Sequence, residues 1–116
     1  MNKEELFQYI RERFSAEPDY PWEDFDGYVF RHANNRKWFA VGMRVRYDRL
    51  GLAREGAAEV VDVKTGPLLM GSYLGRPGVL PGYHMNKGHW VTLLLDGTAE
   101  DADIRELLEL SFDLTK

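Results

Sequence analysis

The chain has 116 residues, a formal net charge of −4 and no cysteine. This length is typical of one domain, taken here as residues 1–116, and the lack of cysteine excludes disulfides and thiolate metal sites. The N-terminal segment is charged and lacks the apolar core of a signal peptide. No apolar run approaches the ~20 residues that span a bilayer, so we expect a cytoplasmic protein without membrane contact.

Charge is spread unevenly along the chain. Residues 28–54 hold seven bases and one acid, whereas residues 1–27 and 55–116 each carry a net charge of −5. The overall acidity argues against strong non-specific binding of nucleic acid, which depends on neutralising phosphates. The middle segment could still form a local basic surface, or it could be a solvated sheet face beside acidic helices.

The first predicted element is a helix over residues 3–14. Asn2 followed by Glu5 is the pattern of an N-cap with a capping box, and apolar residues then recur at helical spacing. Pro18 prevents any continuation. Residues 16–22 are expected to form an ordered loop, because their aromatic side chains would be costly to leave in water.

Two strands are predicted next, at residues 28–32 and 37–47. The longer one alternates clearly between two sets of side chains. One set resembles a core face: Phe39, Val41, Met43, Val45 and Tyr47. The other is small in its middle and basic toward its end: Trp38, Ala40, Gly42, Arg44 and Arg46. We therefore expect the first set to face the helices, and Trp38, Arg44 and Arg46 to face away from them.

The remaining pattern predicts a strand at 58–64, a short helix at 68–74, a strand at 90–95 and a helix at 101–114. Thr98 or Asp101 is expected to cap the last helix. The order helix, three strands, short helix, strand, helix indicates an α+β fold. We expect a two-layer sandwich in which an antiparallel sheet carries the N- and C-terminal helices on one face.

The segment 81–90 concentrates more polar and aromatic chemistry than any other part of the chain. It places tyrosine, histidine, methionine, asparagine and lysine between Gly82 and Gly88, followed by His89 and Trp90. Loops on a rigid scaffold are where recognition residues concentrate. The two glycines permit unusual backbone angles, and we expect the loop between them to be ordered.

Metal binding and catalysis have little support in the sequence. A zinc site needs three or four convergent ligands, whereas His84 and His89 lie in an irregular loop and His32 lies elsewhere. No serine has the context of a nucleophile elbow, and residues 71–75 lack the Lys-Ser/Thr pair of a phosphate loop. We therefore expect neither an enzyme nor a metal or other cofactor.

Nucleic-acid binding has more support, because cationic side chains contact phosphates and aromatic rings stack on bases. The candidate nucleic-acid-binding residues are Arg31, Arg36, Lys37, Trp38, Arg44, Arg46, Tyr83, His84, Asn86 and Lys87. For Trp38 and Tyr83 the alternative is closure of the core. For Lys87 the alternative is a loop cation that bonds nearby carbonyl oxygens.

Six blocks of sequence form a specific combination that extends from about residue 4 to the end of the chain. They are Tyr20–Trp22, Val29–His32, Asn35–Ala40, Pro81–Lys87 with His89 and Trp90, Leu95–Gly97, and Leu107–Leu108 with Ser111–Leu114. The Tyr-His-Met-Asn-Lys-x-His-Trp block is specific when it occurs together with Asn-Arg-Lys-Trp-Phe. On these blocks the chain resembles the MmcQ/YjbR family.

The resemblance implies a CyaY-like, "double wing" arrangement in which helices cover one face of an antiparallel sheet. Members of the family are commonly labelled DNA-binding proteins, a label that rests largely on fold. The implied function is weak, salt-dependent DNA binding through a basic sheet face and the 81–90 loop. The alternative is a protein-interaction or small-ligand-binding domain with no nucleic-acid role. DNA binding is favoured if the basic residues share one surface beside the loop.

Overall fold

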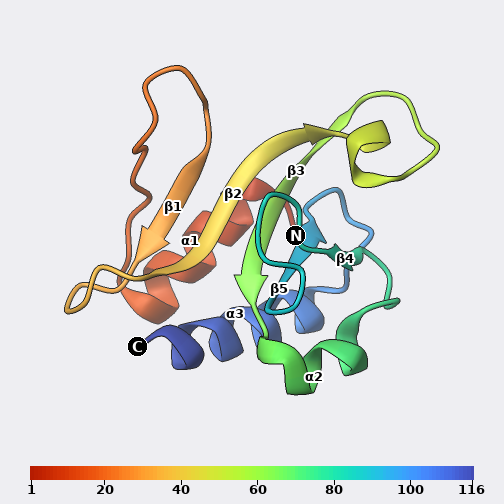
Figure 1. Ribbon diagram of the computed structural model, residues 1–116. Coiled ribbons are helices and arrows are strands. Elements are labelled where there is room, and N and C mark those ends of the chain that lie inside the picture. The colour runs from red at the N-terminus through yellow and green to blue at the C-terminus, as the bar shows by residue number, and fades with distance from the viewer.

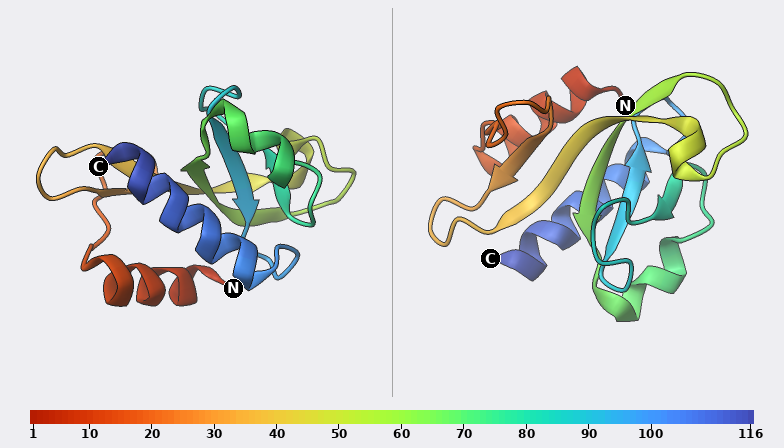
Figure 2. Two further views of the ribbon diagram at one scale, coloured as in Figure 1. Left: turned by 90° about the horizontal axis from the view of Figure 1, so that it is seen from below. Right: turned by 45° about the horizontal axis from the view of Figure 1, so that its top comes forward.

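The computed structural model describes residues 1–116, which form helices packed on one antiparallel sheet. The elements are α1 (Lys3–Phe14), β1 (Tyr28–Arg31), β2 (Trp38–Arg46), the 3₁₀ helix η1 (Tyr47–Leu50), β3 (Ala57–Lys64), α2 (Gly66–Tyr73), β4 (Val79–Pro81), β5 (Trp90–Leu94) and α3 (Asp101–Thr115). The strands pair in the order β1-β2-β3-β5-β4 (Figure 1). Helices α1 and α3 lie on one face and the loop between β4 and β5 lies on the other (Figure 2). The predicted two-layer α+β fold is confirmed.

The two terminal helices begin in different ways. The Asn2 side chain accepts a hydrogen bond from the Glu5 N–H at 2.8 Å, and the Glu5 carboxylate accepts one from the Asn2 N–H at 3.0 Å. The predicted capping box of α1 is thus confirmed. No side chain caps α3, so the expected role of Thr98 or Asp101 is wrong. The Asp101 carboxylate instead binds the amino group of Met1 at 2.7 Å, which joins the starts of the two helices.

The main core lies between α1, α3 and the sheet. The helices contribute five fully buried aliphatic side chains: Leu6, Ile10, Ile104, Leu107 and Leu108. Phe7 of α1 meets Tyr28 of β1 edge to face, with ring centroids 4.7 Å apart. Phe14 and Phe112, which the helical pattern also assigns to the core, are half-buried and stack at its margin with centroids 4.5 Å apart. The helical periodicity therefore located this layer correctly.

A β-bulge interrupts β2 close to its start. Phe30 of β1 pairs with Ala40, whereas the next residue of β1, Arg31, pairs with Trp38. Phe39 is therefore an extra residue of β2 that has no partner of its own in β1. Phe39 and Ala40 both pack in the core on the helix side. The alternation of the strand is shifted by one residue from this point onward.

Beyond the bulge the side chains of β2 alternate in the opposite sense from the one expected. Val41, Met43 and Val45 belong to a second apolar cluster, on the face away from α1 and α3. Arg44 and Arg46 consequently project from the helix side, although Trp38 does pack against the second cluster. The expected placement is thus right for Trp38 and wrong for the two arginines. The reason is that a slip of one residue turns every later side chain to the other face.

Part of β2 has a free edge. The pairing of β1 with β2 ends at Tyr28 and Gly42, so Met43–Arg46 have a strand partner only on the β3 side. No backbone hydrogen bond from residues 20–27 reaches this stretch. The free edge therefore faces the 20–27 segment (Figure 1). Phe25 of that segment and the residues of the free edge line a common cavity.

Strand β4 was not expected from the sequence. It has three residues and ends at Pro81, which lacks an N–H and so suits an outer strand of the sheet. It follows Gly78, whose φ of +73° and close contact with the Ala99 backbone leave no room for a side chain. Helix α2 begins before the expected residue 68, with Pro67 in its first turn, where a missing N–H is tolerated.

Candidate nucleic-acid interface

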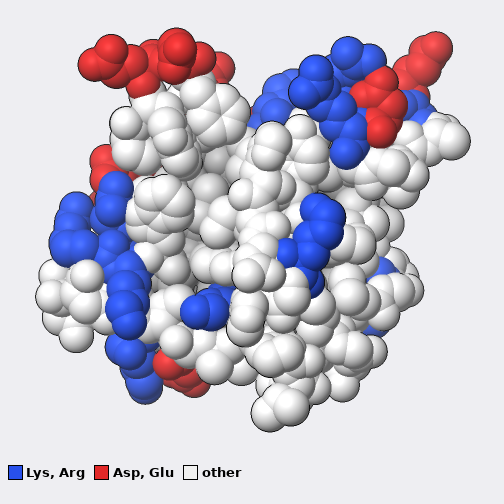
Figure 3. Space-filling model, in the orientation of Figure 1, with Lys and Arg blue, Asp and Glu red and all other residues white.

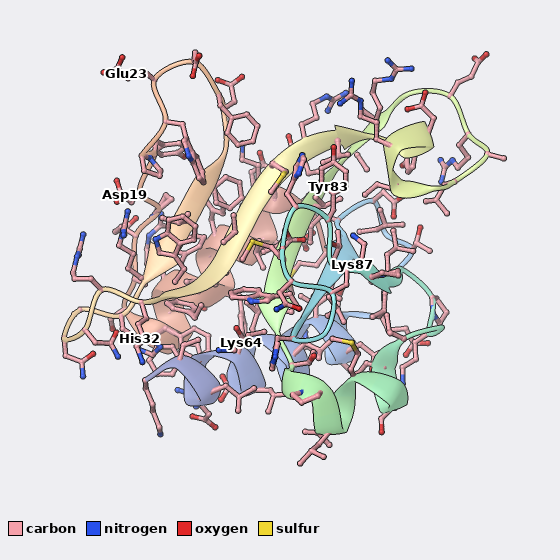
Figure 4. All side chains as sticks on the ribbon, in the orientation of Figure 1. Asp19, Glu23, His32, Lys64, Tyr83 and Lys87 are labelled. Atoms are coloured by element: carbon pink, nitrogen blue, oxygen red, sulfur yellow. The ribbon has the colours of Figure 1, made fainter.

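The loop over residues 82–89 lies against the sheet face that α1 and α3 leave open (Figure 4). The Tyr83 N–H donates a hydrogen bond to the Thr92 hydroxyl of β5 at 2.8 Å. The Lys87 ammonium donates to the carbonyl oxygen of Gly82 at 2.7 Å, which closes the loop on itself. The first half of the loop is thus attached both to the sheet and to its own other end.

Asn86 and His89 fix the second half of the loop. The side-chain oxygen of Asn86 accepts a hydrogen bond from the Gly88 N–H at 2.8 Å. The main-chain carbonyl oxygen of Asn86 accepts one from the Trp90 N–H at 3.0 Å. The His89 carbonyl oxygen accepts a hydrogen bond from the Thr65 N–H at 2.8 Å. Asn86 therefore holds the shape of the loop through its side-chain oxygen and its main-chain carbonyl oxygen.

We expect the amide protons of Tyr83, Gly88 and Trp90 to exchange with solvent slowly, because each N–H donates a hydrogen bond within the structure. Hydrogen–deuterium exchange resolved by residue measures this directly. Ala53 and Glu55, in the exposed connection between η1 and β3, donate no hydrogen bond from their N–H groups and provide an internal reference that should exchange faster. Rapid exchange throughout residues 82–89 would contradict an ordered loop.

Asp62 of β3 is fully buried beneath this loop. One oxygen of its carboxyl group accepts a hydrogen bond from the Thr92 hydroxyl, and the other oxygen has no partner. Burial raises the pKa of Asp62 to about 7, against the opposing effects of the Thr92 hydrogen bond and the positive charge of Lys87. Thr92 thus connects a buried carboxyl group below to the Tyr83 N–H above.

An apolar cavity of about 240 Å³ opens between the 82–89 loop, the 20–27 segment and β2. Its lining consists of Trp22, Phe25, Trp38, Val41, Met43, His84 and Met85. The ring centroids of Trp22 and Trp38 are 5.9 Å apart, and those of Trp22 and Phe25 are 5.2 Å apart, both pairs edge to face. The three rings form one continuous aromatic wall of this apolar cavity.

Arg31 supports the aromatic wall from outside. Its guanidinium group lies over the Trp38 ring, 5.6 Å from the centroid, and its Nε donates to the Asp19 carboxylate at 2.9 Å. The ion pair with Asp19 and the cation–π contact together restrict the orientation of Trp38. Because its charge is paired with Asp19, Arg31 is better placed to hold Trp38 than to bind a phosphate.

A basic cavity of about 460 Å³ adjoins the apolar cavity. Its lining consists of Phe25, Met43, Arg44, Val45, Arg46, Arg49, Tyr83 and His84. Phe25, Met43 and His84 line both cavities, so the two form one continuous groove. The groove runs along β2 and leads from the aromatic wall, which includes Trp38, to three arginines.

The arginines of the basic cavity differ in their ion pairs. Arg46 is paired with Asp48, whereas Arg44 and Arg49 make no ion pair. On this face of the molecule, Lys and Arg side chains gather where β2 ends and again beside the β1–β2 turn (Figure 3). Acidic side chains cap the tip of the 20–27 segment, which includes Glu23 (Figures 3 and 4). The groove is therefore basic at one end, and the acidic tip of the 20–27 segment lies at its margin.

The structure brings some of the predicted binding residues together and separates others. Those that line the groove are Trp38, Arg44, Arg46, Tyr83 and His84. Arg44 and Arg46 line it although they alternate onto the helix side of β2. Lys87 lies beside Tyr83 and Arg49 in a neighbouring cavity. Arg36 and Lys37 lie outside the groove, in the β1–β2 turn, roughly 25 Å along β2 from its basic end.

Sequence reasoning missed two of the three rings of the aromatic wall and one of the arginines. Trp22 was expected only to be ordered, and Phe25 and Arg49 were not proposed as binding residues. The sequence does indicate that Trp22 and Phe25 are special, because they lie beside the acids of residues 23–26 and an aromatic side chain is costly to expose to water. Phe25 keeps 43% of its surface exposed at the groove.

The histidines do not form a metal site with other side chains. No group of three or more His, Asp and Glu residues is placed to hold a metal ion. His32 lies in the core, where its Nε2 is 2.8 Å from the Thr115 hydroxyl and burial lowers its pKa. His84 is the histidine that faces the groove.

Among the helices, none has the length and apolar character needed to cross a membrane.

Comparisons with known sequences agree over nearly the whole chain. The model of the YjbR family matches residues 3–114. The uncharacterized protein YyaQ of Bacillus subtilis (strain 168) is 36% identical over 117 residues, which cover 100% of this chain and 99% of YyaQ. All the elements that form the groove lie within the matched region.

Solved structures share the same arrangement. A crystal structure of a Pseudomonas syringae protein has a TM-score of 0.95 at 41% identity, with 100% of both chains covered. A solution NMR structure from the same organism has a TM-score of 0.90 at 41% identity, covering 100% of this chain and 94% of that one. A Deinococcus radiodurans protein shares the fold with a TM-score of 0.70 at 24% identity, covering 97% of this chain and 77% of that one.

Proposed function

Because this chain belongs to the YjbR family and lines one groove with aromatic rings and arginines, we propose that it is a non-enzymatic DNA-binding protein. The observation that carries the proposal is the continuity of the apolar and basic cavities. A polyanion that also carries flat rings matches both halves of such a groove.

Two arginines of the basic cavity make no ion pair with a carboxylate. Arg44 and Arg49 each present N–H donors suited to bidentate contact with a phosphate group. Arg46 shares its charge with Asp48 and contributes less. Tyr83 and His84 add a hydroxyl group and ring nitrogens beside the arginines. These groups would position a phosphate backbone, a role that does not require base-specific contacts.

The binding is expected to be weak and strongly dependent on salt. The whole chain has a net charge of −4, and Glu23 and Asp26 line a third cavity together with Arg44. These carboxylates lie within reach of a strand bound to the arginines, and repulsion between them and phosphates operates over the ~10 Å screening length at 0.1 M salt. Attraction is therefore confined to the groove.

A second candidate function is the binding of a small anionic ligand that carries an apolar ring. The observation that favours it is the recessed apolar cavity, which six hydrophobic residues line and which one small molecule could fill. Such a ligand would use the same arginines for its acidic group. The experiment below separates the two functions, because only DNA binding requires a polymer.

Neutralising the free arginines should weaken DNA binding and reduce its dependence on salt. We expect the Arg44→Gln/Arg49→Gln variant to bind a labelled oligonucleotide about tenfold less tightly, with the slope of log affinity against log salt reduced by about 2. Glutamine keeps much of the apolar stem of each side chain, so the fold should be retained. Fluorescence anisotropy between about 50 mM and about 200 mM salt measures both quantities.

The matched control is the Arg36→Gln/Lys37→Gln variant. It removes the same charge from residues that also make no ion pair but lie outside the groove. Its affinity and salt slope should stay close to those of the wild type. Equal losses in both variants would show that binding is spread over the surface, and absence of wild-type binding at low salt would exclude a DNA-binding function.

A further inference from the structure

We propose that the apolar cavity takes one unpaired nucleobase while the arginines of the basic cavity hold the adjacent phosphates, so that single-stranded DNA is preferred over duplex. This inference rests on the proposed function and specifies its substrate. It gives a role to Trp22, Phe25 and Trp38, which line the apolar cavity and would not contact phosphates.

The apolar cavity has the size and the lining suited to one flat ring system. Its volume of about 240 Å³ is below the roughly 300–1,000 Å³ of cavities that enclose drug-sized ligands. Six of the seven lining residues are hydrophobic, and the seventh is His84. The imidazole nitrogens of His84 can donate to or accept from the polar edge of a base. A base would thus find apolar contact on its faces and one hydrogen-bonding group at its rim.

The aromatic wall is held in place before any ligand arrives. Trp22 packs edge to face against both Trp38 and Phe25. Trp38 is also held by Arg31, which Asp19 fixes in turn. A ring that stacks on one member of this wall meets the edge of another, which is the geometry that aromatic groups favour. Little side-chain freedom would be lost on binding, and this favours affinity.

The loop that completes the cavity is held in an uncommon backbone conformation. His84 has a φ of 61°, in the left-handed region that residues with a Cβ rarely adopt. Its ring lies against Tyr83, with centroids 4.1 Å apart, and both residues line the basic cavity. The conformation directs His84 into the junction between the two cavities, where a base would join its phosphate.

The recessed position of the apolar cavity explains the preference for single strands. A base within a duplex is stacked on both faces and paired along its edge, so it must leave the helix before it can enter the cavity. A base in a single strand is already free to turn outward. Phosphates of either form can reach the arginines, so only the aromatic contact distinguishes the two forms.

The test compares three labelled probes of about twelve nucleotides: a single strand, the corresponding duplex, and a strand of the same length carrying abasic sites. We expect the single strand to bind at least about tenfold more tightly than either of the others, as stacking of one base would give. Phe25→Ala and Trp38→Leu should abolish this preference. Tyr20→Ala is the control, because Tyr20 is an exposed aromatic residue of the same segment, 55% exposed, that does not line the apolar cavity. Thermal melting of each variant verifies that it is folded.

The outcomes distinguish this inference from the function on which it rests. If no probe binds at low salt, both are overturned. If the duplex or the abasic strand binds as tightly as the single strand, DNA binding stands and the base-binding cavity is overturned. The same holds if folded Phe25→Ala and Trp38→Leu variants keep the preference, because the base would then lie elsewhere. Loss of the preference in these variants but not in Tyr20→Ala supports the inference.

Discussion

Replacing Gly42 by alanine should destabilise the protein by about 3 kcal/mol. A Cβ atom at this position would lie far inside van der Waals contact with the Tyr28 ring. That ring is fully buried between β2 and Phe7 of α1, so it has no solvent-exposed position to move into. Either β1 must separate from β2 or α1 must shift, and both would disturb the main core.

Urea denaturation of the Gly42→Ala variant measures the loss, with Gly71→Ala as the matched control. Gly71 lies within α2, and a Cβ atom there would meet nothing within 4 Å. In a helix, alanine is favoured over glycine by up to about 1 kcal/mol, so the control should be neutral or slightly stabilised. If the two variants unfold at the same urea concentration, the close packing of Tyr28 on Gly42 is refuted.

The contribution of Asp62 to the stability of the protein should fall as the pH rises from about 4 to about 7. The folded protein raises the pKa of this carboxyl group to about 7, whereas its ordinary value is 3.8. Between these values the folded state retains a proton that the unfolded state has released, so raising the pH favours unfolding. The carboxyl group is fully buried, and the whole interval corresponds to a loss on the order of 4 kcal/mol. Above pH 7 its contribution should become constant.

The Asp62→Asn variant isolates this effect. Asparagine has nearly the same shape but no titrating proton, so the decline attributable to Asp62 should disappear while other pH effects remain. Free energies of unfolding measured for both proteins from pH 4 to pH 8 give the difference directly. The same replacement at the exposed Asp24 should leave the decline unchanged. Parallel profiles for the wild type and Asp62→Asn would show that Asp62 is ionised in the folded state throughout.

Local features of this fold could be predicted from the sequence, whereas features that depend on a distant partner could not. The capping box needs only Asn2 and Glu5, three residues apart, and it was identified correctly. The bulge at Phe39 depends on how β2 meets β1, and the alternation from residue 37 to 47 is regular enough to hide it. β4 was missed because a three-residue strand has no periodicity of its own.

The candidate site was only partly predictable for the same reason. Residues 81–90 attract attention in the sequence because several costly side chains are close together. The groove, however, forms where four segments meet: 20–27, β2, η1 and the 82–89 loop. Phe25 and Arg49 gain their significance from that meeting alone. The basic residues 36 and 37 looked equivalent to the others in sequence but lie at the opposite end of β2.

The unpaired stretch of β2 also affects the tendency of this chain to associate with other copies of itself. An exposed strand edge offers backbone donors and acceptors to any other strand, which is a route to aggregation. Here Met43–Arg46 carry two arginines, with Arg49 close by, and like charges on two such edges would repel. The same cations would thus protect the monomer in the absence of a ligand. Variants that lose several of them should therefore be examined for concentration-dependent self-association before weaker binding is attributed to the groove.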